Sequence, residues 1–206
     1  MLTDKSVRDL LAAFASSDPT PGGGSASAIA SAIGASLLAM VSGLPKTRTG
    51  SDDDRAALAA AAAALTGVQQ QLTEAVDLDT AAYDQVVAAY KMPKATPAEQ
   101  ESRKAGIQRA LRSATDVPLG VMRLSSMALE QARAVAAHGH RAAASDVGVA
   151  IALAGAGFHG ARLNVEINLG GLSDKAYADA VRVEIGHLAE RTAAAIRDAE
   201  ALLGAG

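Results

Sequence analysis

The chain has 206 residues, a formal net charge of −3 and no cysteine, and this length suits a single domain. The weakly acidic charge gives no electrostatic reason to expect nucleic acid or an anionic membrane as a partner. The absence of cysteine excludes disulfide bonds, thiolate zinc sites and cysteine nucleophiles.

The apolar residues predict an all-α fold. Half of the chain is hydrophobic, yet it holds only three tyrosines, two phenylalanines and no tryptophan, and runs of β-branched residues are almost missing. We expect an up-and-down helical bundle of long antiparallel helices in one domain, residues 1–206. Charged residues are spread through positions 1–16, which fits neither a signal peptide nor a transit peptide, so we expect the cytoplasm.

The first predicted helix covers residues 2–15. Thr3 is its expected N-cap, and its apolar positions recur at helical spacing. We expect these apolar side chains to point inward: Val7, Leu10, Leu11 and Phe14.

A loop rich in proline and glycine, Pro19-Thr20-Pro21-Gly22-Gly23-Gly24-Ser25, then leads into a helix that ends near Leu44. Proline and consecutive glycines disfavour the helix interior. The three glycines allow close approach of the backbone to a ligand or to a neighbouring helix, and residues alone leave both open. Ser25 is the expected N-cap, and exposed amides at this end would suit an anion.

Residues 25–44 are twenty uncharged positions in succession. Five are serine, six alanine and two glycine, which is weak for a membrane span. Large apolar and small residues lie on opposite sides of the helical wheel. The pattern predicts a helix buried on two sides, one of them a close small-residue contact, and no membrane. Lys46 and Arg48 follow in a short loop, where they are either solvated or placed to hold a carboxylate or phosphate.

Residues 52–91 contain no proline and predict one helix of about 40 residues, roughly 60 Å long. Its core stripe recurs every three or four residues from Leu58 to Val76 and continues through Tyr83 and Tyr90. Asp79 falls on this apolar stripe. A carboxylate there is costly unless it is paired, hydrogen-bonded or placed in a cleft.

The next helix begins with a capping box formed by Thr96 and Glu99, with Pro97 in its first turn. Pro118 is expected to kink or restart it. It ends at His138-Gly139-His140, where a histidine pair invites a metal reading, but the sequence offers no second ligand cluster. We therefore expect no metal.

Residues 142–170 form a second segment of low charge. Asp146, Asn164 and Asn168 share one helical face, with the carboxylate about 27 Å from the amides at helical rise. Asp146 could instead cap the helix, and the asparagines could bond a neighbouring helix. A final helix follows, capped by Ser173 or Asp174.

Six motifs follow one another along the chain: the Pro19–Ser25 loop, Asp79-xxx-Tyr83, Ala88-Ala89-Tyr90-Lys91-Met92-Pro93-Lys94, Asp116-Val117-Pro118-Leu119, Ser145-Asp146-Val147-Gly148-Val149-Ala150 and Leu163-Asn164-Val165-x-Ile167-Asn168. Taken together and in this order, they resemble the cyclodeaminase/cyclohydrolase family, which includes stand-alone methenyltetrahydrofolate cyclohydrolases and the C-terminal domain of formiminotransferase-cyclodeaminase. The resemblance covers nearly the whole chain.

The resemblance implies a homodimer that acts on tetrahydrofolate one-carbon adducts, polyglutamylated forms included, without metal or organic cofactor. Asp79 and Asp146 would be catalytic. The chain departs from the family's usual pattern at residues 43–50 and 139–142, both in expected substrate-facing loops. The substrate-binding residues implied are Gly22, Gly23, Gly24, Ser25, Lys46, Arg48, Tyr83, Lys91, Asn164 and Asn168.

Three functional hypotheses follow from the resemblance. The first is hydrolysis of 5,10-methenyltetrahydrofolate to 10-formyltetrahydrofolate, and the length of the chain matches the stand-alone form. The second is cyclodeamination of 5-formimidoyltetrahydrofolate with release of ammonia. The third is a non-catalytic bundle that binds folate or a protein. Sequence leaves open whether Asp79 and Asp146 meet in one pocket, within a chain or across a dimer.

Overall fold

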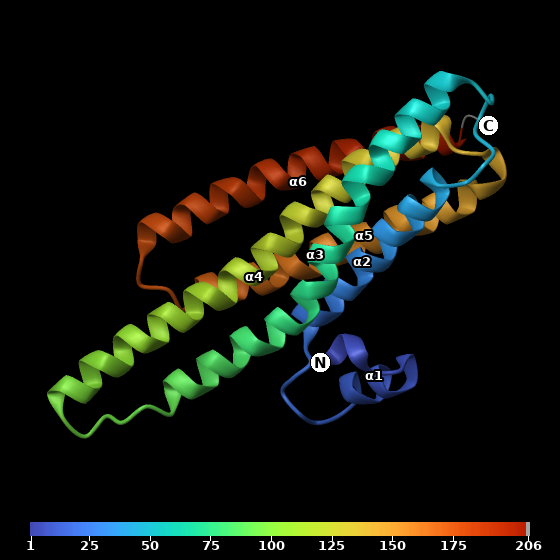
Figure 1. Cartoon of the computed structure of the whole chain (residues 1–206). Coiled ribbons are helices and arrows are strands. Elements are labelled where there is room, and N and C mark those ends of the chain that lie inside the picture. Colours follow the sequence, from blue (N-terminus) through green and yellow to red (C-terminus); the bar gives the residue numbers. More distant parts are fainter. Residues whose placement is uncertain (205–206) are drawn as a thin grey trace.

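The computed structural model describes residues 1–204 and contains six α-helices and no strand over that range. The predicted all-α bundle of long helices is confirmed (Figure 1). Short 3-10 turns precede the first and fifth helices, at Leu2–Asp4 and Arg141–Ala143. The helices are α1 (Val7–Phe14), α2 (Gly23–Ser42), α3 (Asp52–Tyr90), α4 (Pro97–His138), α5 (Ala144–Leu169) and α6 (Lys175–Gly204).

Four helices form the centre of the molecule. Helix α2 packs between α3 and α5, α4 packs against the same two helices, and α6 lies mainly along α4. Helices α2 and α5 run antiparallel, because Gly23 lies near Asn164 while Gly34 lies near Ala150. The start of α2 and the end of α5 therefore meet at one end of the bundle, and the end of α2 meets the start of α5 at the other.

The contact between α2 and α5 depends on small residues. A Cβ atom added at Gly34 would lie 2.7 Å from the Ala150 carbonyl oxygen, and one added at Gly157 would lie 2.0 Å from Ser31 Oγ. Only glycine allows the two backbones to come this close. The sequence prediction of a close small-residue contact on α2 is therefore confirmed.

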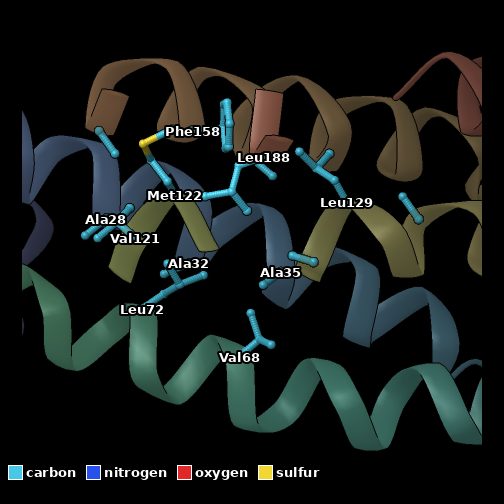
Figure 2. Packing of buried hydrophobic residues seen from close by; sticks show 14 of the residues in the cluster. Ala28, Ala32, Ala35, Val68, Leu72, Val121, Met122, Leu129, Phe158 and Leu188 are labelled. Carbon is cyan, nitrogen blue, oxygen red and sulfur yellow. The ribbon is translucent and has the colours of Figure 1, made fainter. Parts of the chain in front are cut away.

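The core is made mainly of alanine, leucine and valine from every long helix, with Met122 and Phe158 among them (Figure 2). Leu65 and Leu72 of α3 and Leu129 of α4 are completely buried. Each such leucine contributes about 1.5–3 kcal/mol of burial free energy. The stripe predicted on α3, from Leu58 to Val76, is buried along its whole length.

Helix α1 differs from its prediction in two ways. It begins at Val7 with Ser6 as its N-cap, whose Oγ accepts a hydrogen bond from the Asp9 amide, because Thr3 donates its hydroxyl proton to Asp77 instead. None of its residues is buried, and Val7 is 75% exposed. The expectation that its apolar side chains point into the core was wrong, because α1 lies at the end of the bundle where α2 begins (Figure 1).

The sequence predicted either a kink or a restart at Pro118. Helix α4 continues through this residue, so the restart does not occur. A proline inside a helix leaves the carbonyl four residues earlier without its amide donor. Here that carbonyl belongs to Ala114, and Asn168 Nδ2 of α5 donates a hydrogen bond to it over 2.7 Å. The neighbouring helix supplies the donor that proline lacks, so α4 remains intact.

Two segments, Gly23–Ser42 and Arg141–Leu169, are long and apolar enough by composition to cross a membrane. Both lie in the centre of the bundle, where 56% and 39% of these windows are buried. Core helices pass the same test, so the finding is weak support for a membrane protein. It does show that α5 keeps much apolar surface outside the core.

Candidate active site

A cavity of about 300 Å³ lies where the start of α2 meets the end of α5, with walls from α3 and α4. Its lining contains most of the residues that the sequence singled out. The site residues predicted from the sequence that line it are Gly22, Gly23, Gly24, Asp79, Tyr83, Asn164 and Asn168.

The Gly-rich loop brings the backbone of α2 against a side chain of α3. A Cβ atom at Gly24 would lie 2.0 Å from Asp79 Oδ1, so no larger residue fits while the carboxylate holds this position. Helix α2 begins at Gly23, two residues before the predicted start. Its N-cap residue is Gly22, which has no side chain to accept a hydrogen bond from the amides of the first turn. The glycines therefore serve close packing, and the helix start is left open to a group from elsewhere.

Asp79 of α3 caps the start of α2. Its Oδ2 accepts hydrogen bonds from the Ser25 amide at 2.8 Å and from Ser25 Oγ at 3.0 Å. The negative charge also lies at the positive end of the α2 dipole. Ser25 was predicted to cap α2, but its hydroxyl faces α3, where it also lies 2.9 Å from the Val76 carbonyl oxygen. The cap comes from α3.

Asp79 differs from a purely structural cap because only one of its oxygens is used. Both hydrogen bonds from Ser25 go to Oδ2, while Oδ1 has no partner among residues 1–204. Burial raises the pKa of the Asp79 carboxyl above its ordinary value, and the bonds from Ser25 oppose this only in part. A carboxyl group with a raised pKa and a free oxygen is suited to accept and return a proton.

Two asparagines on α5 line the same cavity as Asp79. Asn164 Nδ2 donates to the Gly160 carbonyl at 2.8 Å, and Asn168 Nδ2 donates to the carbonyl of Ala114. Both amide nitrogens are thus held by backbone groups. Neither Oδ1 atom has a hydrogen-bond donor in the described part of the chain, so both remain as acceptors for a ligand.

The remaining walls are uncharged and, apart from Thr20 and the Tyr83 hydroxyl, apolar. Tyr83, which is 40% exposed, Val86 and Leu111 line the cavity, and no lysine or arginine does so within residues 1–204. Leu111 and Ala114 of α4 were not predicted as site residues, because periodicity does not reveal how α4 is aligned with α5. Pro118 was the one available signal, since it leaves the Ala114 carbonyl in need of a donor.

The other predicted site residues lie elsewhere in the chain. Asp146 is in the first turn of α5, about 27 Å along the helix from Asn164. Lys46 and Arg48 are in the loop between α2 and α3, where Arg48 donates to the Ala136 carbonyl at 2.6 Å. Lys91 follows α3, about 18 Å along the helix from Asp79. A single chain does not bring these four residues to the cavity.

One member of the histidine pair at the end of α4 has a structural partner. His138 Nδ1 lies 2.8 Å from Asp54 Oδ1, and Asp54 is buried beneath the loop that holds Arg48. Residues 1–204 contain no group of three or more histidine, aspartate or glutamate side chains placed to hold a metal ion. This Asp54–His138 pair was not predicted from the sequence, because the two residues are far apart in the chain.

Comparison with known proteins agrees with this architecture. A family model described as formiminotransferase-cyclodeaminase matches residues 6–187. A methenyltetrahydrofolate cyclohydrolase from Methylorubrum extorquens is 40% identical over 179 residues, which is 87% of this chain and 86% of that protein.

Larger relatives match over part of their length. The formimidoyltransferase-cyclodeaminase of Rattus norvegicus is 32% identical over 187 residues, which is 91% of this chain but 35% of that protein. This chain therefore spans about a third of the rat protein.

A solved structure shares the fold. The formiminotetrahydrofolate cyclodeaminase of Thermotoga maritima superposes with a TM-score of 0.88 at 24% identity, covering 100% of this chain and 98% of that one. The family that the six motifs resembled is confirmed by the match over residues 6–187 and by the 40% identity. The chain belongs to the formiminotransferase-cyclodeaminase family.

Proposed function

We propose that this protein hydrolyses 5,10-methenyltetrahydrofolate to 10-formyltetrahydrofolate. The observation that carries the proposal is the Asp79 carboxyl, which has a raised pKa and one unbonded oxygen in a cavity of about 300 Å³. The extent of the similarity supports methenyltetrahydrofolate as the substrate, because the Methylorubrum cyclohydrolase is matched over 86% of its own length.

The chemistry requires a base and a negative charge at one place. The reacting carbon lies between N5 and N10 in a cationic amidinium, so a nearby carboxylate stabilises the substrate's charge. In our proposal, Asp79 Oδ1 accepts a proton from a water molecule as the water oxygen bonds to that carbon. The bond from this carbon to N5 then breaks and N5 takes the proton from Asp79. The new hydroxyl group loses its remaining proton to solvent as the C=O bond forms, and the formyl group stays on N10.

The remaining cavity residues would orient the substrate. The pterin ring carries N–H donors, and the free Oδ1 atoms of Asn164 and Asn168 are acceptors held in place by their own amide nitrogens. Tyr83 and Leu111 supply an apolar wall for the flat ring. The scheme requires no metal and no organic cofactor.

The direct test is Asp79→Asn, which keeps the shape and removes the base. We expect kcat to fall by about 10²–10⁴-fold, the usual contribution of a positioned acid–base group. The loss of methenyltetrahydrofolate absorbance measures it. Asp84→Asn is the matched control, because Asp84 is on the same helix and exposed. Turnover by Asp79→Asn close to that of the control would contradict the assignment.

Cyclodeamination of 5-formimidoyltetrahydrofolate is the second candidate. Its support is the match to formimidoyltransferase-cyclodeaminases, including 32% identity to the rat protein. In this reaction N10 bonds to the carbon of the protonated formimidoyl group, and the same carboxylate accepts the proton that N10 loses. It passes this proton to the formimidoyl nitrogen, and the bond between that nitrogen and the carbon breaks to release ammonia. Release of ammonia by the purified protein from 5-formimidoyltetrahydrofolate, compared with its rate on the methenyl compound, decides between the two.

We also propose that the protein acts as a homodimer. Apolar side chains on the outer sides of α2 and α5 are exposed in the single chain, among them Ile33, Met40 and Leu163. Exposed apolar side chains on two neighbouring helices are typical of an interface between copies. Sedimentation or light scattering of the purified protein measures the oligomeric state.

A further inference from the structure

Helix α4 contains a proline one turn beyond the point where it lines the cavity. Pro118 is buried inside the helix, and Ala114, four residues earlier, is a cavity residue. Proline has no amide hydrogen, and its ring pushes away the carbonyl group four residues before it. The Ala114 carbonyl therefore lacks its helical donor. The gap in the hydrogen-bond pattern of α4 thus falls at the wall of the cavity.

The side chain of Asn168 on α5 fills this gap. Its Nδ2 atom donates a hydrogen bond to the Ala114 carbonyl oxygen at 2.7 Å. A side-chain amide has one end that donates and one end that accepts, and only the donating end can bond to a carbonyl oxygen. The Ala114 carbonyl therefore fixes which way the Asn168 amide is turned. Its Oδ1 atom is left as the end available to a ligand in the cavity that Asn168 lines.

Asn164 provides a comparison within the same cavity. Its Nδ2 atom donates to the Gly160 carbonyl at 2.8 Å, within its own helix. That carbonyl also accepts the main-chain amide of Asn164, because both residues lie in the regular part of α5. The Gly160 carbonyl does not depend on a side chain for its donor, whereas the Ala114 carbonyl does. The proline thus acts on Asn168 and not on Asn164.

A proline at this position is costly for the helix. Proline is the least favourable residue inside an α-helix, and alanine is the most favourable. Sequences break a local rule of this kind mainly at functional sites. Pro118 lies beside such a site and is tolerated because Asn168 compensates for the missing amide.

We infer that Pro118 is a positioning residue, which withholds an amide from the Ala114 carbonyl and so holds Asn168 with its Oδ1 acceptor available to the ligand. A ligand edge that carries N–H donors is then favoured over an edge that carries acceptors. The pterin ring of a tetrahydrofolate has such an edge. The identity of this ligand rests on the proposed function, whereas the orientation of Asn168 rests on its bond to Ala114.

Pro118→Ala tests the inference, because it restores the missing amide. The new N–H would bond to the Ala114 carbonyl, and the Asn168 amide would become free to turn. Alanine also favours the helix, so this variant should melt at the wild-type temperature or above it. A loss of ligand binding could then not be ascribed to a loss of fold. Pro97→Ala is the matched control, because Pro97 is exposed in the first turn of the same helix, where amides have no helical acceptor.

Nuclear magnetic resonance reads the orientation directly. The chain has only two asparagines, Asn164 and Asn168, so asparagine labelled at its side-chain nitrogen gives two amide signals, both from the cavity. Asn168→Asp removes one signal and so assigns the pair. In Pro118→Ala the Asn168 signal should shift and its hydrogens should exchange faster with solvent, while the Asn164 signal stays in place. An Asn168 signal that is the same in Pro118→Ala as in the wild type would overturn the inference.

Kinetics test what the orientation does for the substrate. With 5,10-methenyltetrahydrofolate, Pro118→Ala should raise KM by about 2–10-fold, the effect of one hydrogen bond, and leave kcat nearly unchanged. Asn168→Ala should raise KM at least as much, and the double variant should be no worse than Asn168→Ala alone. An unchanged KM in Pro118→Ala, or additive losses in the double variant, would overturn the positioning role.

The positioning role and the proposed function fail in different ways. A wild-type protein that does not turn over the methenyl compound would overturn the proposed function, and the two asparagine signals would still decide the orientation of Asn168. A wild type that is active, with a KM and an Asn168 signal indifferent to Pro118→Ala, would overturn the positioning role alone.

Discussion

Two aspartates on α3, Asp54 and Asp79, occupy opposite ends of the bundle and differ in how many hydrogen bonds their carboxylates accept. Asp54 is 5% exposed and accepts hydrogen bonds from Thr47 Oγ1, from the amide and hydroxyl of Thr49, and from His138. Asp79 is half-buried and has Ser25 as its only recorded partner in the described chain, on a single oxygen. Both oxygens of the Asp54 carboxylate accept hydrogen bonds, whereas one oxygen of Asp79 accepts none within residues 1–204.

The pKa values follow this difference. The hydrogen bond from His138, followed by those from Thr49, holds the pKa of Asp54 well below its ordinary value. Burial raises the pKa of Asp79, because Ser25 compensates only part of the lost hydration. A saturated carboxylate stabilises the fold, whereas an unsaturated one in a cavity remains available for proton transfer. Residue type and helix are the same, so the partners decide the role.

The largest expected effect comes from replacing each of the two aspartates, Asp79 and Asp54, with asparagine. Asp79→Asn should remove most activity, as described above, yet keep or raise the melting temperature, because it removes a charge that burial disfavours. Asp54→Asn should lower the melting temperature, because it replaces a charged acceptor of four hydrogen bonds. Thermal unfolding followed by circular dichroism compares the two. Equal losses of stability would contradict the distinction between them.

A smaller effect is expected from adding one methyl group beside Asp79. Gly24→Ala places a Cβ atom 2.0 Å from Asp79 Oδ1, so the carboxylate must move. A displacement of about 1 Å at a reacting group costs on the order of 10²-fold in rate. Gly67→Ala is the matched control on α3, because nothing lies within 4 Å of its added Cβ. It should keep full activity and stabilise the helix by up to about 1 kcal/mol. Normal kcat in Gly24→Ala would show that the position of Asp79 is not critical.

The pH dependence of stability sharpens the comparison further. The pKa of Asp54 is lower in the folded chain than its ordinary value of 3.8. Its contribution to the free energy of unfolding is therefore complete above about pH 4 and is lost as the pH falls below that value. Urea unfolding between pH 6 and pH 3 measures this loss. Asp54→Asn should show a shallower decline, and an unchanged slope would remove Asp54 as its source.

The mildest effect concerns the pH dependence of activity. The proposed base must be ionised, and burial raises the pKa of Asp79. The rate constant kcat/KM should therefore fall toward acid with an apparent pKa above that of an exposed aspartate. The contributions of the two aspartates to the free energy of unfolding should vary with pH in opposite directions. That of Asp79 declines as the pH rises through its folded pKa, whereas that of Asp54 declines as the pH falls. A kcat/KM profile without this acid limb would exclude Asp79 as the base.

Local sequence patterns determined most of the helices. The capping box of Thr96 and Glu99 marked the start of α4 correctly, and the apolar stripe from Leu58 to Val76 identified the buried side of α3. The same stripe singled out Asp79 as a carboxylate in an apolar position. These features depend on residues three or four positions apart, and such spacings are visible in one dimension.

Tertiary structure decided everything that depends on a second helix. Ser25 was predicted to cap α2, but Asp79 of α3 caps it instead by accepting a hydrogen bond from the Ser25 amide. Pro118 was predicted to kink or restart α4, but the helix does not restart, because Asn168 of α5 supplies the missing donor. Asp79 and Asp146 could not be placed relative to each other, because their separation depends on which end of α5 meets the start of α2. Sequence alone determined which carboxylate was out of place, and packing decided which of its oxygens stayed free.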